Sequence, residues 1–83
     1  MSGTVIGWHL GHIGPQLAAA IGWRYLAAPS PTQPVQVPPG PVALVGYSLG
    51  CSGLRAQLEA GTDPRVVVLI DGTHSTKGPG GQV

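Results

Sequence analysis

The chain has 83 residues, of which 8% are charged, and a formal net charge of +1 at pH 7. A chain of this length forms one small domain at most, and its few basic residues cannot form the basic surface that nucleic-acid binding requires. The lone cysteine, Cys51, excludes an internal disulfide bond. No signal-peptide pattern is evident, and no apolar run approaches the roughly 20 residues that span a bilayer. We therefore expect a soluble, cytoplasmic protein.

The first part of the chain predicts two strands with a helix between them. Residues 4–9 are β-prone, and residues 24–28 form a second short apolar strand. Between them, Pro15 suits the first turn of a helix that continues over residues 16–21. Gly22 is a natural stop for that helix.

A proline-rich connector follows the second predicted strand. Residues 29–41 contain six prolines, so this segment is predicted to be polyproline-like or rich in turns rather than helical. The apolar residues 42–45 after it are predicted to form a third strand.

The second half of the chain predicts another helix and a fourth strand. In the helix of residues 49–60, two leucines share a face, whereas three polar side chains point elsewhere. Gly61 caps its end. Residues 65–70 show no alternation of apolar and polar side chains, as expected for a parallel strand that is covered on both faces. The two leucines are Leu54 and Leu58, and the polar residues are Arg55, Gln57 and Glu59.

This alternation of strands and helices predicts the α/β fold class, with a small parallel sheet of about four strands and two helices. We expect residues 1–77 to form the folded core, with residues 29–41 as its connector. Residues 78–83 are interpreted as a flexible tail.

A Gly-Tyr-Ser-Leu-Gly motif at residues 46–50 joins the strand of residues 42–45 directly to the next helix. In this context G-x-S-x-G predicts a tight strand-to-helix turn that exposes the hydroxyl of Ser48 above the sheet edge. The residues two before and two after the serine approach each other closely, and both are glycine, Gly46 and Gly50. The N–H groups that begin the helix would stabilise a developing oxyanion.

The order of these segments resembles the central part of an α/β-hydrolase domain. Residues 5–11 look like the third strand of that family with its loop, and residues 23–29 like its fourth strand. Residues 46–50 match its nucleophile elbow, and residues 66–72 are similar to its sixth strand. The resemblance covers about residues 4–74, and in family order these strands would lie 4-3-5-6 across an incomplete hydrolase core.

The resemblance implies a role for several residues. Ser48 matches the nucleophile, and the backbone N–H of Leu49 matches the first donor of the oxyanion hole. The second donor would come from the backbone at Leu10 or Gly11. The implied chemistry is acyl transfer to the serine followed by hydrolysis of a small-molecule ester or related acyl substrate, without a cofactor.

The chain departs from the family pattern in two places. The connector of residues 29–41 replaces a helix, and no segment corresponds to the later strands that supply the acid and the general-base histidine. Asp71 is the remaining candidate acid, since some lipases place the acid after the sixth strand, and His74 is the candidate base. Asp71 is also typical of a turn after a strand, and His74 of a solvated loop.

The remaining chemistry-bearing residues have simpler interpretations. His9 and His12 lack the further ligands that a metal needs, so we expect them to shape the oxyanion loop or to pack beside Ser48. Cys51 is interpreted as a small buried residue. Trp8 and the second tryptophan, Trp23, are expected in the core or at its rim.

Two hypotheses of different classes follow. In the first, the chain belongs to a serine hydrolase, with its missing strands supplied by further chain or by a partner subunit. In the second, it is a non-catalytic remnant or interaction module that retains the fold without a complete triad. Because a four-stranded sheet has two open edges, we expect self-association or a partner that supplies the missing half.

Overall fold

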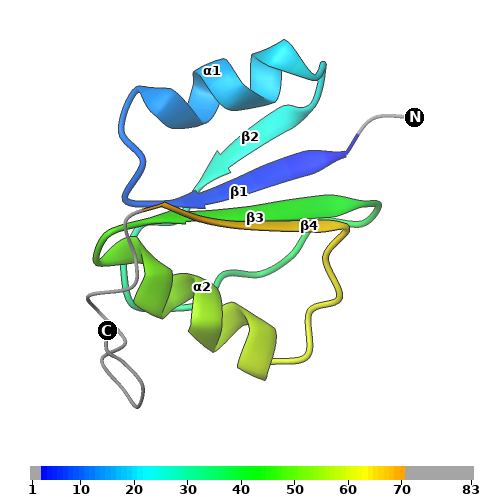
Figure 1. Cartoon of the computed structure of the whole chain (residues 1–83). Coiled ribbons are helices and arrows are strands. Elements are labelled where there is room, and N and C mark those ends of the chain that lie inside the picture. Colours follow the sequence, from blue (N-terminus) through cyan, green and yellow to red (C-terminus); the bar gives the residue numbers. More distant parts are fainter. Residues whose placement is uncertain (1–2, 71–83) are drawn as a thin grey trace.

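Four parallel strands form one sheet, and one helix packs on each of its faces (Figure 1). This computed structural model describes residues 3–70. The fold class is confirmed, with four parallel strands and two helices in the expected sequence. The elements are β1 (Thr4–Trp8), α1 (Ile13–Ala20), β2 (Arg24–Ala27), β3 (Val42–Tyr47), α2 (Gly50–Glu59) and β4 (Val66–Ile70). The domain boundary at residue 77 and the tail of residues 78–83 lie outside the described residues.

The strands lie in the order β2-β1-β3-β4 across the sheet. Because all of them are parallel, their carboxyl ends meet at one edge of the sheet. Trp8, the last residue of β1, pairs with Gly46 near the end of β3. The loop after β1 and the turn after β3 are therefore neighbours.

The first helix begins two residues before Pro15, which the sequence places in its first turn. It runs over Ile13–Ala20, and the N–H of Ile13 donates to the carbonyl of Leu10 at 3.3 Å. Pro15 lies within the first turn, where its missing N–H costs no helical hydrogen bond. The stop at Gly22 is confirmed, because this residue takes a φ of 73°.

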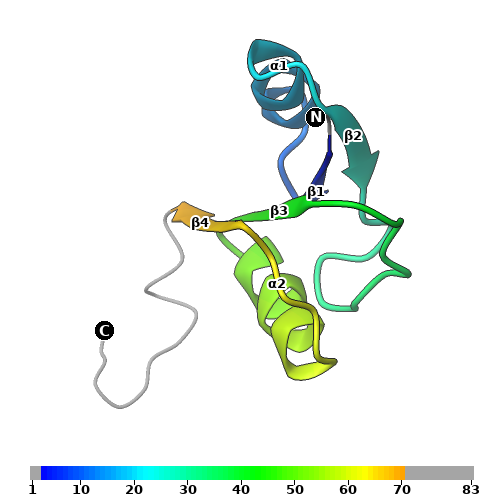
Figure 2. The ribbon, with the colours of Figure 1, turned by 90° about the vertical axis from the view of Figure 1, so that its right-hand side faces the viewer.

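The face of the sheet that carries α2 is closed by that helix and the proline-rich connector together. The connector has no helix or strand, as predicted, and it runs beside α2 (Figure 2). The indole Nε1 of Trp8 donates to the carbonyl of Gln33 at 2.8 Å, and the N–H of Gly53 donates to Pro31 at 2.9 Å. The core on this face consists of Ile6, Trp8, Val42, Leu44 and Leu54, with Val35 and Val37 of the connector against it.

The face that α2 buries differs from the predicted one. Gln57 is only 2% exposed, whereas Leu58 is 38% exposed. The Oε1 atom of Gln57 accepts the N–H of Val35 at 2.6 Å, and its Nε2 donates to Oγ1 of Thr62 at 2.9 Å. The prediction that Gln57 points away from the buried face was wrong, because the connector brings the part-buried N–H of Val35 to this face, and such a donor needs an acceptor.

The face that carries α1 is only partly covered. The helix packs over β1 and β2. Tyr25 fills the space beneath it, since a Cβ atom at Gly14 would overlap the phenol ring. Burial raises the pKa of Tyr25 above its ordinary value of 10.0. An apolar groove of about 530 Å³ remains beside α1, over β3 and β4.

The prediction that the last strand is covered on both faces was wrong. Val66 is 50% exposed and Leu69, on the other face of β4, is 51% exposed. The apolar segment does form a parallel strand, as predicted, but this strand lies at the edge of the sheet. Both helices pack over the other strands. The edge strand therefore stays exposed to solvent, although its apolar composition is typical of a buried strand.

Within residues 3–70, neither helix has the length and apolar character needed to cross a membrane.

Candidate active site

Ser48 occupies the turn between β3 and α2 in a backbone conformation that few side chains adopt. Its φ is 54°, in the left-handed region, and the only other such non-glycine residue among residues 3–70 is His9, with φ 65°. The left-handed conformation costs an L-residue about 1–2 kcal/mol, because Cβ crowds the following carbonyl oxygen. Such outliers persist only where the surrounding structure holds them, and they cluster at functional sites.

The two glycines of the turn are required by close backbone approaches. A Cβ atom on Gly46 would lie 3.0 Å from both the Cα of Cys51 and the carbonyl oxygen of Gly50. A Cβ atom on Gly50 would overlap the carbonyl oxygen of Trp8 and lie 2.9 Å from the Cβ of His9. The start of α2 is thus in direct contact with the end of β1, and any larger side chain would push them apart.

Hydrogen bonds fix the turn on both sides. The N–H of Ser48 donates to the carbonyl of Ile70 at 2.9 Å, which ties the turn to the end of β4. The N–H of Cys51 donates back to the carbonyl of Ser48 at 3.1 Å. The Cys51 thiol is fully buried and donates to the carbonyl of Gly46 at 3.4 Å. The prediction that Cys51 is a small buried residue is confirmed.

The backbone N–H of Leu49 is the candidate first oxyanion donor. Among the hydrogen bonds found between residues 3–70, none uses this N–H as its donor. Leu49 has helical backbone angles and immediately precedes α2, so its N–H belongs to the positive end of that helix. The group can therefore donate to an anionic oxygen that develops beside Ser48.

The loop after β1 contacts the same turn through His9. The imidazole ring stacks on Tyr47, the residue before Ser48, with 6.4 Å between ring centroids and 15° between ring planes. Of the two candidates for the second oxyanion donor, Leu10 is buried in the core beneath α1, and Gly11 is exposed with φ 61°. The structure brings His9 to the turn, as the sequence allowed.

The left-handed backbone of His9 was not predicted from the sequence. Glycine is the usual residue in this conformation, and histidine is among the few other residues that adopt it more often than most. A Cβ atom on Gly50 would lie 2.9 Å from the Cβ of His9, so the start of α2 lies close to this residue. His12 is exposed. In residues 3–70, no three histidine, cysteine or acidic side chains are grouped as metal ligands.

The candidate acid and base, Asp71 and His74, lie outside the described residues. Their roles therefore stay predictions.

Comparisons with protein-family models, with curated proteins and with solved structures found no match to this chain. Its candidate site is therefore defined by its own sequence and geometry.

Proposed function

We propose that the chain carries the nucleophile of an α/β-hydrolase-type serine hydrolase that acts on an ester or related acyl bond. The observation that supports this most strongly is the left-handed backbone of Ser48 on a turn between a parallel strand and a helix. This conformation directs the serine away from the sheet, and the glycines at positions 46 and 50 permit the tight turn.

In the proposed reaction, Oγ of Ser48 attacks the acyl carbon while the base, His74, accepts the hydroxyl proton. The oxyanion that forms is stabilised by the N–H of Leu49 and by a backbone N–H at Leu10 or Gly11. Collapse of the tetrahedral intermediate expels the alcohol, which receives the proton from the base. Water then hydrolyses the acyl-serine, and Asp71 orients the histidine in both steps.

The arrangement of the strands supports the same proposal. The family pattern expects the order 4-3-5-6, and the observed order β2-β1-β3-β4 has the same connectivity. The carbonyl of Ile70 accepts a hydrogen bond from Ser48, and Asp71 follows Ile70 directly in the sequence. The residue before the candidate acid is thus hydrogen-bonded to the nucleophile turn.

A second candidate function is that of a non-catalytic interaction module. The exposure of the apolar edge strand β4, together with the adjoining groove beside α1, favours this alternative. Open apolar edges of this kind pair readily with other chains.

Labelling with a fluorophosphonate probe separates the two candidates. An activated serine attacks the phosphorus atom and expels fluoride, so we expect the full chain to be labelled and the Ser48→Ala variant to lose the label. Ser52→Ala is the matched control, because Ser52 lies in the first turn of the helix that follows Ser48, and this variant should retain labelling.

Circular dichroism must show that each variant folds. A folded wild-type chain that takes no label, or a folded Ser48→Ala variant that keeps it, would contradict the hydrolase proposal. The first of these results, together with concentration-dependent association, would favour the interaction module.

A further inference from the structure

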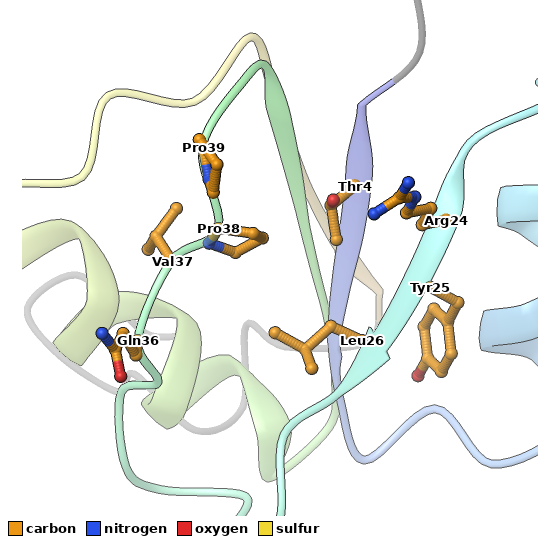
Figure 3. A pocket seen from close by; sticks show the side chains of 8 residues that line it. All are labelled: Thr4, Arg24, Tyr25, Leu26, Gln36, Val37, Pro38 and Pro39. Atoms are coloured by element: carbon orange, nitrogen blue, oxygen red, sulfur yellow. The ribbon is translucent and has the colours of Figure 1, made fainter.

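A second polar site lies at the end of the sheet opposite Ser48. A groove of about 440 Å³ separates β2 from the proline-rich connector, within the size range of small-molecule sites (Figure 3). A hollow of about 200 Å³ adjoins it and shares Thr4, Arg24 and two connector prolines. Thr4 and Arg24 begin their strands and pair across the sheet, whereas Ser48 follows the end of a parallel strand.

The hydroxyl of Thr4 is the first group that points to a ligand. Thr4 is only 7% exposed, and its side chain lines both hollows. Its backbone N–H donates to the carbonyl of Pro41 at 3.0 Å, but its hydroxyl makes no hydrogen bond to any of residues 3–70. Buried hydroxyl groups are ordinarily paired, because a buried polar atom without a partner is destabilising.

The guanidinium of Arg24 is the second group that points to a ligand. It extends from β2 toward Thr4 above the groove (Figure 3). The acidic side chains within residues 3–70 are Glu59, at the end of α2, and Asp63, in the turn after it. Neither of them lines the groove or the adjoining hollow. Among residues 3–70, those that line the groove therefore supply a cation and a hydroxyl donor but no carboxylate.

The walls of the groove are largely apolar. Leu26 contributes from β2, and Val37, Pro38 and Pro39 contribute from the connector (Figure 3). The hydrogen bond from Val35 to the buried Gln57 ties the connector to α2, just before the residues that form this wall. The side chain of Tyr25 is directed to the opposite face, toward α1.

We propose that this groove binds a small monocarboxylate with an apolar body. The guanidinium of Arg24 donates to the carboxylate, which also accepts the hydroxyl of Thr4, and the hydrocarbon lies along Leu26 and Val37. A single arginine matches one negative charge, and the apolar walls match a short hydrocarbon. The site is independent of the proposed chemistry at Ser48.

Titration with sodium hexanoate, followed by amide chemical shifts of the full chain, tests the proposal. We expect shifts at Thr4, Arg24, Leu26 and Val37. Arg24→Gln should weaken binding about tenfold or more, because it removes a charge-assisted hydrogen bond. Arg65→Gln is the matched control, since Arg65 precedes another strand, and it should bind as the wild type does. The neutral isostere hexanamide should bind about tenfold more weakly than hexanoate.

The Thr4→Val variant gives a second, independent readout. Because it replaces an unpartnered buried hydroxyl with a methyl group, it should raise the melting temperature of the ligand-free chain while weakening hexanoate binding. Thr4→Ser should retain binding. Equal binding of hexanoate and hexanamide, unchanged affinity in Arg24→Gln, or shifts confined to the turn around Ser48 would each overturn the proposal. Absence of binding at tens of millimolar hexanoate would also overturn the proposal, because this concentration is far above the dissociation constant of a specific site.

Discussion

The two ends of the sheet use left-handed backbone in different ways. In the loops that lead into β2, β3 and β4, the residues with positive φ are Gly22, Gly40 and Gly61. At the carboxyl ends of β1 and β3, His9 and Ser48 adopt the same region although each has a Cβ atom. Glycine takes this conformation without steric cost, whereas other residues do not. The structure therefore accepts a conformational cost where we propose chemistry and avoids it in the turns at the other end.

The glycines at the two ends of the sheet also differ in how closely other atoms approach them. A Cβ atom on Gly22, Gly40 or Gly61 would meet no atom within 4 Å. A Cβ atom on Gly50 would overlap the backbone of Trp8. The turn glycines of the amino end are thus needed for their backbone angles, and Gly50 is needed for space.

The largest expected effect comes from Gly50→Ala. The added methyl group collides with the backbone carbonyl of Trp8 at the end of an inner strand, which cannot move without shifting β1. We expect the free energy of unfolding to fall by about 3 kcal/mol, the upper part of the range for overpacking. That is a large share of the roughly 4–12 kcal/mol typical of a domain of this size. Urea denaturation measures the loss.

A smaller effect is expected from Gly61→Ala, which serves as the counterpart at the amino end. Its methyl group enters open space, so the cost is the left-handed backbone alone, about 1–2 kcal/mol. If this variant lost as much stability as Gly50→Ala, then the distinction between glycines needed for their backbone angles and glycines needed for space would be wrong.

The arrangement of strands and helices could be predicted because its signals are local. Gly22 and Gly61 end the two helices, and the prolines of residues 29–41 exclude a helix. The burial of Gln57 could not be predicted, because it depends on the N–H of Val35, 22 residues away. The exposure of β4 depends on which strand lies at the edge, and a run such as residues 66–70 does not encode its own position in the sheet.

The candidate site was predictable to a similar degree. The motif of residues 46–50 indicated the turn and the need for two glycines, because both follow from short-range geometry. The stacking of His9 on Tyr47 joins the loop after β1 to the end of β3, which are far apart in the sequence, and the left-handed backbone of His9 was not predicted either. The groove at Thr4 and Arg24 was missed for the same reason, since its walls come from β1, β2 and a connector that follows them.

The fold holds Ser48 in a costly left-handed backbone conformation, and the stabilities of the Ser48→Gly and Ser48→Ala variants together test this cost. Both variants lack the hydroxyl, so their difference isolates the Cβ atom. The measurement is the free energy of unfolding in urea, with Ala56→Gly in the interior of α2 as the reference for an ordinary site, where glycine should be less stable by about 0.5–1 kcal/mol. At position 48 the sign should reverse, with Ser48→Gly more stable than Ser48→Ala by about 1 kcal/mol. A Ser48→Ala variant as stable as Ser48→Gly, or more stable, would show that the fold imposes no such cost at position 48.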